Sequence, residues 1–244
     1  MPVAAPSTVL RRRKVTFVLP SLEAGGAQRV LLNLARHVDR ERFNLSIILF
    51  DATGPLATQL PENGPIVVLG RRRLRYALPR LALAMRRLNP DVIVSTFGHV
   101  NLAIVLFRKI LGINSKIVIR EPNTPSASMP SLKHTWFLRL GYKRLYSRAD
   151  YVICQSQAIA EELLHDFGVR QNQIAYLKNP VDVNAIRAGI SRPYRPTPEG
   201  CFFVAMGSLT HQKGFDRLLA WFSHLPREAS LWIIGSGEEM PTLI

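Results

Sequence analysis

The sequence predicts an α/β fold in which a parallel sheet with helices on both faces is followed by the first β-α-β part of a second domain. Short apolar runs alternate with longer segments whose apolar residues recur at helical spacing, an order typical of such folds. The alternation stops in a proline-rich segment at residues 191–200 and then starts again. An apolar share of 47% in 244 residues is enough for a substantial core.

The expected elements follow one another along the chain. The first strand runs over 15–20, and its helix covers 27–38. Further strands are expected at 44–50, 66–69, 91–96, 116–119, 151–154 and 173–177. Helical patterns cover 74–88, 100–111, 131–147 and 157–167. After the break, a strand at 201–206 precedes a helix that starts behind Gly214.

The break divides the chain into two domains. We expect a complete N-terminal domain at residues 1–190, a linker at 191–200 and an incomplete second domain at 201–244. A single β-α-β unit is too short to form a domain alone. The sequence is therefore expected to be truncated within its C-terminal domain.

Basic residues exceed acidic ones by 32 to 17, which gives a net charge of +15. The excess is concentrated in three clusters, at 11–14, among the arginines between 71 and 87, and between 133 and 148. Such clusters are typical of proteins that bind an anionic membrane surface or a polyanionic ligand, and an ordinary solvated face is the alternative. Nucleic acid is not expected as a partner, because no recognisable nucleic-acid-binding module is present.

No apolar segment reaches the roughly 18 residues that a membrane-spanning helix needs, so membrane contact would be peripheral. The apolar run behind residues 11–14 is also too short for a signal peptide. Cys154 and Cys201 lie inside apolar runs and show no metal-ligand spacing. Both are expected to be core residues of a protein in the reducing cytosol.

Ligands of open α/β sheets bind at the carboxyl ends of the strands. Gly25 and Gly26 stand between the first strand and its helix, where glycine lets a ligand approach the backbone and a helix start favours an anion. The G-x-G-x-x-G order of a dinucleotide site is missing, which argues against a nicotinamide-dependent enzyme. An ordinary turn is the alternative for these glycines.

Two further strand ends carry polar residues. His99 follows the fourth expected strand, where an imidazole could meet a sugar hydroxyl or a phosphate, although a lone histidine is often structural. Arg120, Glu121 and Asn123 follow the fifth expected strand. We expect these three to form a polar lining of the same cleft, and the alternative is an ion pair that braces the loop.

The start of the second domain carries the pattern of an anion site. The strand at 201–206 ends at Gly207 and Ser208, and Lys213 stands directly before the next helix. A helix start offers free backbone N–H groups, and a lysine on the same turn adds a full charge for a phosphate. Ser156, at another strand end, is expected only to cap the helix that follows it.

Taken together, these segments resemble the family-4 glycosyltransferases, which are retaining enzymes, use nucleotide-sugars and have the GT-B fold. The resemblance covers essentially the whole chain and depends on the order and spacing of several motifs. These motifs are GGAQR at 25–29, REPNT at 120–124, NPVD at 179–182 and the segment at 207–214.

The resemblance implies two Rossmann-like domains that face each other. The N-terminal domain would hold the acceptor, with the cleft residues at 120–123 on this side, and residues 201–244 would begin the donor domain. Gly25 and Gly26 would approach the phosphate and sugar of the donor. His99 would be a catalytic residue in contact with the transferred sugar.

In the donor domain, the resemblance implies that Lys213 binds the diphosphate, with Gly207 and Ser208 beside it. The family has an arginine at the position of Ser208, which leaves one cation unaccounted for. A glutamate pair that holds the donor in the family would follow the last residue of this sequence. Asn179 and Pro180 are expected between the domains, and nothing implies a metal or a cofactor besides the nucleotide-sugar substrate.

We therefore expect a transferase that builds a lipid-linked or cell-surface glycan, as a peripheral protein on the cytoplasmic face of a membrane. Its partners would be a nucleotide-sugar, a glycan or lipid-linked acceptor and an anionic membrane surface. The sequence as it stands is expected to be inactive without further C-terminal chain. A non-catalytic module that binds a glycan, a lipid carrier or a protein is the alternative.

Overall fold

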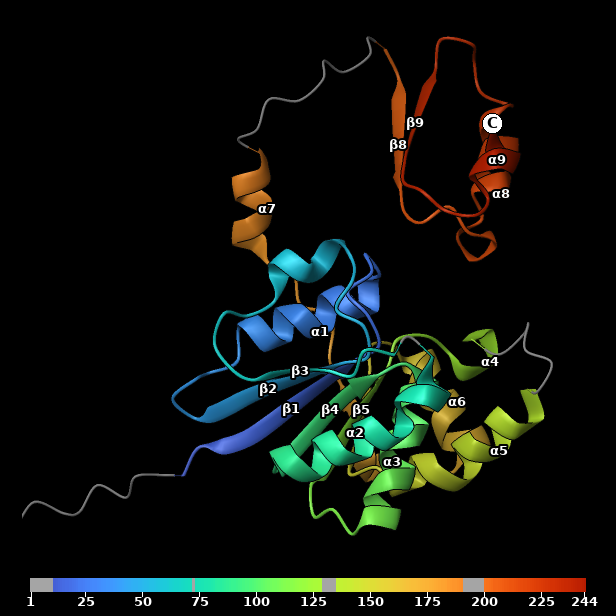
Figure 1. Cartoon of the computed structure of the whole chain (residues 1–244). Coiled ribbons are helices and arrows are strands. Elements are labelled where there is room, and N and C mark those ends of the chain that lie inside the picture. The colour runs from blue at the N-terminus through green and yellow to red at the C-terminus, as the bar shows by residue number, and fades with distance from the viewer. Residues whose placement is uncertain (1–10, 72, 129–134, 191–199) are drawn as a thin grey trace, which may run out of the picture. The chain divides into compact units, whose positions relative to one another are not determined.

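Two compact units, residues 1–182 and 183–244, make up the chain. The computed structural model describes residues 11–71, 73–128, 135–190 and 200–244, and Figure 1 labels its elements. The linker predicted at 191–200 lies outside the described residues except for Gly200. Its extent therefore stays a prediction.

A seven-stranded parallel sheet forms the first unit, with the strand order β3-β2-β1-β4-β5-β6-β7. Its strands are β1 (Arg13–Leu19), β2 (Phe43–Leu49), β3 (Ile66–Val68), β4 (Val92–Thr96), β5 (Lys116–Glu121), β6 (Tyr151–Cys154) and β7 (Ile174–Tyr176). Each strand expected in this domain is present. The predicted Rossmann-like α/β fold is therefore confirmed.

Helices connect most of these strands. They are α1 (Gly26–Arg36), α2 (Leu74–Leu88), α3 (Gly98–Leu111), α4 (Pro125–Ser128), α5 (Thr135–Leu145) and α6 (Gln157–Phe167), with the 3-10 helices η1 (Pro55–Gln59), η2 (Tyr146–Arg148) and η3 (Gln171–Gln173). Ser156 caps α6 as predicted, because its hydroxyl accepts a hydrogen bond from the N–H of Ile159 at 3.4 Å.

Both faces of the sheet are covered, and each face has its own core. Phe17, Leu19 and Ile47 pack with the buried residues of α1 and η1. The intervening residues Val18 and Ile48 belong to a second core, which contains apolar residues of α2, α3, α5 and α6. Figure 1 shows α1 on one side of the sheet and α2 with α3 on the other. Burial on both faces explains why the strands are continuous apolar runs rather than alternating ones.

The second unit contains one parallel strand pair, as the predicted β-α-β unit requires. Its elements are α7 (Val183–Ile190), β8 (Phe202–Met206), η4 (His211–Lys213), α8 (Phe215–Phe222), β9 (Ser230–Ile234) and α9 (Met240–Leu243). The sequence patterns did not predict α7. The described residues do not cover all apolar side chains of the strand pair. Met206, for example, is 81% exposed.

Two expectations about individual residues are wrong. Arg120 and Glu121 are the last two residues of β5 and not part of a loop, because their backbones pair with β6 at Ile153 and Cys154. Cys201 is exposed, since it lies outside the strand pair, just before β8. Cys154 is buried in the core, as predicted.

Candidate functional site

The order of the strands reverses between β1 and β4. From β1 the chain moves outward through β2 and β3, and it then returns to β4 on the other side of β1 before it continues to β7. Such a switch point opens a crevice at the carboxyl ends of the strands, which is the usual ligand site of open α/β sheets. The loops that predicted a site, at Gly25-Gly26 and at His99, leave β1 and β4 and therefore flank this crevice.

The loop after β1 brings backbone rather than side chains to the crevice. α1 starts at Gly26, and Gly25 is its N-cap in an extended conformation. A Cβ atom on Gly25 would lie 2.2 Å from Oε1 of Gln28, so any side chain here would displace this buried glutamine. The first turn of α1 contains no acidic residue, which leaves the helix start favourable for an anion.

The loop after β2 supports this glycine loop. The N–H of Leu22 donates to the carbonyl of Thr53 at 3.3 Å, and the N–H of Leu56 donates to the carbonyl of Leu22 at 3.0 Å. Gly54 has φ 137°, and a Cβ atom on it would lie 2.3 Å from the carbonyl oxygen of Leu22. Only glycine fits such a position. Gly54 is not among the predicted site residues, although a glycine in the loop after a strand is a usable signal.

A strained turn presents the start of α3 at the same crevice. Phe97, between β4 and α3, has φ 71° and ψ 126°, which bulky residues rarely adopt. Such strain persists where surrounding contacts enforce it, often at functional sites. Gly98 makes the close packing possible, because a Cβ atom there would lie 1.7 Å from Oη of Tyr142. The turn places His99 on the first turn of α3, at the carboxyl edge.

His99 is exposed, and its ring centre lies 6.1 Å from that of Phe97. Desolvation of the covered part of the ring lowers the pKa of His99 from its ordinary value of 6.5. The imidazole is therefore neutral near pH 7, with one nitrogen as a donor and the other as an acceptor. This form suits hydrogen bonding to a sugar hydroxyl.

Glu121 does not line a cleft, contrary to the expectation. It is 1% exposed, and its Oε2 accepts hydrogen bonds from Tyr146 at 2.5 Å and from Tyr142 at 3.2 Å. Burial raises the pKa of Glu121 to about 7, although these hydrogen bonds and the charge of Arg120 act in the opposite direction. Asn101 of α3 donates to the hydroxyl of Tyr146 at 3.2 Å. Glu121 therefore links β5 to α5 through Tyr142 and to η2 through Tyr146, and Asn101 connects α3 to the same network.

Arg120 connects the carboxyl ends of several strands. Its buried guanidinium donates to Oδ1 of Asn179 at 2.7 Å, to Oε1 of Gln155 at 2.9 Å and to Oγ1 of Thr96 at 3.4 Å. These partners stand at or behind the ends of β7, β6 and β4. Asn123 is exposed in the loop after β5. The structure thus brings Arg120 together with Asn179. That Gln155 also binds the guanidinium of Arg120 could be found only from the tertiary structure.

Backbone hydrogen bonds and one close glycine–glycine contact hold the strand ends of the second unit together. The N–H of Gly207 donates to the carbonyl of Ile234 at 3.0 Å, and the N–H of Leu209 donates to the carbonyl of Ser236 at 2.9 Å. A Cβ atom on Gly235 would lie 1.8 Å from the carbonyl oxygen of Gly207. The loop that contains Gly207 and Ser208 therefore packs directly on the loop after β9.

Lys213 ends η4 and stands directly before α8, as predicted, with Gly214 in a left-handed conformation between them. The guanidinium of Arg217 lies over Gly214, where a Cβ atom would be 2.5 Å from its Nη2. Arg217 therefore places a second cation at Gly214, the residue that follows Lys213. Asp216, in the first turn of α8, weakens this helix start as an anion site.

The described residues contain no group of three or more His, Cys, Asp or Glu side chains that could hold a metal ion. In the same part of the chain, no helix combines the length and the apolar character needed to cross a membrane. Cys154 is not a candidate nucleophile, because burial raises the pKa of its thiol to about 12.

Comparison with known proteins finds glycosyltransferases among the relatives of this chain. An uncharacterized glycosyltransferase of Methanocaldococcus jannaschii is 27% identical over 218 residues, which cover 84% of this chain and 50% of that protein. The N-acetylgalactosamine-N,N'-diacetylbacillosaminyl-diphospho-undecaprenol 4-alpha-N-acetylgalactosaminyltransferase of Campylobacter jejuni is 24% identical over an alignment of 245 residues, covering 92% of this chain and 63% of the enzyme. The chain thus spans between half and two thirds of the length of these relatives.

The fold is shared with GT-B glycosyltransferases of known structure. Anabaena HepE, solved in complex with UDP and glucose, superimposes with a TM-score of 0.69 at 18% identity, over 93% of this chain and 62% of that protein. The family model of Glycosyltransferase Family 4 matches residues 24–185, a range that begins at the glycine loop and includes β2 through β7. The chain therefore belongs to glycosyltransferase family 4.

Proposed function

We propose that this chain provides the acceptor-binding domain and the start of the donor-binding domain of a glycosyltransferase. The enzyme would transfer a sugar from a nucleotide-sugar to a glycan or lipid-linked acceptor, with retention at the anomeric carbon. The observation that carries the proposal is the crevice between β1 and β4, where the glycine loop and His99 stand at two helix starts. The activity belongs to the whole protein, because the chain spans only part of its relatives.

Two similar proteins support the classes of substrate. Anabaena HepE was solved with UDP and glucose, which supports a nucleotide-sugar as donor. The name of the Campylobacter relative includes a diphospho-undecaprenol glycan, which supports a lipid-linked acceptor. Both inferences concern the class of the donor and of the acceptor, not the individual sugars.

Each site residue has a chemical task in this proposal. Gly25 and Gly26 let the donor approach the free N–H groups of α1, and the neutral ring of His99 binds a hydroxyl of the transferred sugar. Lys213 and Arg217 neutralise the diphosphate that leaves with the nucleoside. Fixed cations and helix N-termini stabilise charge where it develops in the transition state, and this accelerates departure.

We also propose that the protein acts as a peripheral protein at the inner face of a membrane in the synthesis of a cell-surface glycan. Trp136 and Phe137 of α5 are 60% and 59% exposed and stack on each other with ring centres 3.7 Å apart. Arg139, Lys143 and Arg144 lie on the same helix. Exposed aromatic and basic side chains on one helix are typical of segments that lie at a membrane surface.

Replacement of His99 by alanine tests the catalytic proposal. In the full-length protein with its best nucleotide-sugar, we expect His99→Ala to lower kcat about ten- to hundredfold, as expected for the loss of one strong hydrogen bond in the transition state. His37→Ala is the matched control, since His37 is exposed and its ring nitrogen Nδ1 hydrogen-bonds to the carbonyl of Asn33 at 2.9 Å. Equal turnover of the two variants would contradict the role of His99. Glycan binding without any turnover would favour the non-catalytic module.

A further inference from the structure

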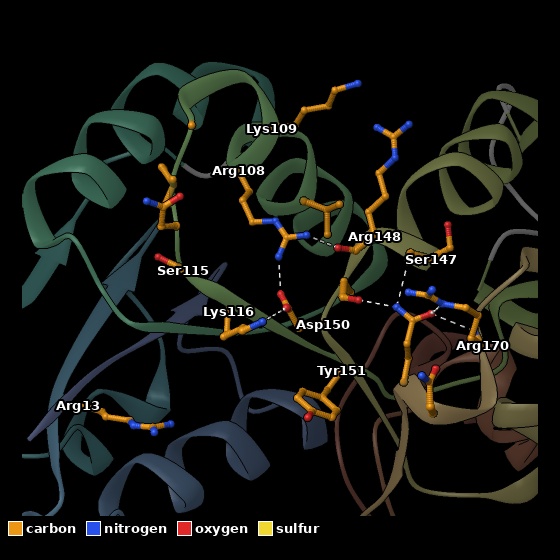
Figure 2. A pocket seen from close by; sticks show the side chains of 17 residues that line it. Arg13, Arg108, Lys109, Ser115, Lys116, Ser147, Arg148, Asp150, Tyr151 and Arg170 are labelled. Carbon is orange, nitrogen blue, oxygen red and sulfur yellow. Dashed lines mark hydrogen bonds and ion pairs between the residues drawn. The ribbon is translucent and has the colours of Figure 1, made fainter.

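A basic hollow of about 1160 Å³ lies at the opposite edge of the sheet of the first unit. Its walls are the amino ends of β5 and β6, the end of α3, η2 and the turn before β7, as Figure 2 shows. The candidate transfer crevice lies at the carboxyl ends of the same strands. The basic hollow is therefore a separate site, and it does not depend on the proposed transfer reaction.

The lining of the basic hollow carries six cationic side chains and a single carboxylate. The cations are Arg13, Arg108, Lys109, Lys116, Arg148 and Arg170, and the carboxylate is Asp150. They come from five segments spread between residues 13 and 170, which the fold brings together.

Asp150 neutralises only part of this charge. Arg108 forms an ion pair with its carboxylate, and Lys116 Nζ lies 2.9 Å from its Oδ1. Among the described residues, Arg13, Lys109 and Arg148 make no ion pair with an acidic side chain. Arg170 donates its Nε to Oε1 of the uncharged Gln173 at 3.2 Å. Four cations around the hollow therefore lack a counter-charge from the described residues.

Cations around a concave surface repel one another and raise the local concentration of anions. Guanidinium groups match the oxygens of phosphate with two parallel hydrogen bonds, and they do so better than a lysine ammonium. Figure 2 shows Lys109 and Arg148 on one side of Asp150 and Arg13 on the other. A ligand that meets both sides needs more than one anionic group.

We propose that the basic hollow binds a ligand that carries two or more phosphate groups, outside the transfer site. The same chemistry could come from a soluble oligophosphate or from phospholipid headgroups. The side chains of Lys109 and Arg148 supply charge on the open side, while Arg108 and Lys116 stay engaged with Asp150 and hold the wall in place.

Tripolyphosphate is the soluble probe for the test. We expect titration calorimetry on the full-length protein to show that the double variant Lys109→Ala/Arg148→Ala raises the Kd about tenfold or more. The matched control is Arg86→Ala/Arg87→Ala, which removes two exposed charges of α2 outside the hollow. If both double variants lose affinity for tripolyphosphate equally, or if neither loses affinity, the hollow does not bind soluble oligophosphates.

A second arm uses vesicles of phosphatidylcholine with and without phosphatidylglycerol. A selective loss of binding to the anionic vesicles by Lys109→Ala/Arg148→Ala assigns the hollow to headgroups, and a selective loss of tripolyphosphate binding assigns it to soluble phosphates. If the variant binds both probes like the control, the basic hollow is not a phosphate site. The His99→Ala variant is expected to bind both phosphate probes as tightly as the wild type. A failure of this proposal can therefore be distinguished from a failure of the proposed transfer reaction.

Discussion

At the scale of single residues, Glu121 has the most unusual surroundings in the described chain. Its carboxyl group is buried between two tyrosine hydroxyls, and burial raises its pKa to about 7. The folded protein therefore keeps a proton on Glu121 that the unfolded chain releases above pH 4.5. Stability falls as pH rises from about 4.5 to 7, because the folded state binds more protons over this range.

Glu121→Gln should remove this pH dependence. The variant cannot lose a proton, so we expect it to be more stable than the wild type at pH 8 by an amount on the order of 3 kcal/mol, at about 1.36 kcal/mol for each pKa unit. The difference should vanish toward pH 4.5. Urea unfolding at several pH values measures this difference, and Glu161→Gln, which changes an exposed glutamate of α6, is the control. An unchanged pH slope in Glu121→Gln would show that this carboxyl does not hold the extra proton.

At the scale of elements, Asp150 fixes the amino ends of β5 and β6 to the end of α3. It accepts a hydrogen bond from the N–H of Ile117 at 2.9 Å and pairs with Lys116 and Arg108. Burial acts to raise the pKa of Asp150, but these contacts outweigh it, and the pKa lies below the ordinary 3.8. The carboxylate therefore stabilises the fold above pH 3.8, and this contribution is lost as pH falls through the folded pKa.

Asp150→Ala should lower the free energy of unfolding at pH 7 by about 1–3 kcal/mol, the cost of leaving partly buried donors unsatisfied. The difference in the free energy of unfolding should shrink at acid pH, where the carboxyl group of Asp150 in the wild type becomes protonated and loses its charge. Denaturant titration of the full-length protein tests this, with the exposed Asp166→Ala as control. Equal stabilities of the two variants at pH 7 would contradict the anchoring role.

At the scale of the whole molecule, the charge of +15 is the dominant property. Part of it surrounds the basic hollow, and part lies on α5 beside the exposed pair Trp136 and Phe137. Basic residues attract an anionic bilayer with about 1 kcal/mol each near the surface, and salt screens this attraction. Aromatic side chains add apolar contact that salt does not screen.

Trp136→Ala/Phe137→Ala should therefore weaken binding to anionic vesicles by about tenfold, while wild-type binding falls as salt rises. Co-sedimentation with vesicles measures both effects. The control is Tyr176→Ala, which removes an aromatic ring that is 56% exposed on β7 and lies outside the basic hollow. Binding that ignores lipid charge would sink the proposal of an anionic membrane surface.

Local patterns were sufficient for much of this molecule. The positions of the strands could be predicted from the sequence, because both faces of the sheet are buried and each strand is therefore a continuous apolar run. The cap at Ser156 and the helix start behind Gly214 follow from one or two neighbouring residues. The candidate site at Gly25-Gly26 and His99 could also be predicted from the sequence, because parallel strands bring their carboxyl ends to one edge of the sheet.

Contacts between distant residues were outside the reach of such patterns. Arg120 and Glu121 are charged residues in a strand, which composition assigns to a loop, and only their partners Asn179, Gln155 and Tyr146 explain their burial. Charged side chains enter a core only when they are paired or hydrogen-bonded, and the pairing depends on three-dimensional neighbours.

The sequence by itself therefore determined the α/β class, the order of the strands and the family. Tertiary structure alone decided that Glu121 is a buried support rather than a cleft residue, and that cations from five separate segments surround one hollow. The physical reason is that periodicity and capping depend on residues within a few positions, whereas burial, pKa and charge density depend on every neighbour in space.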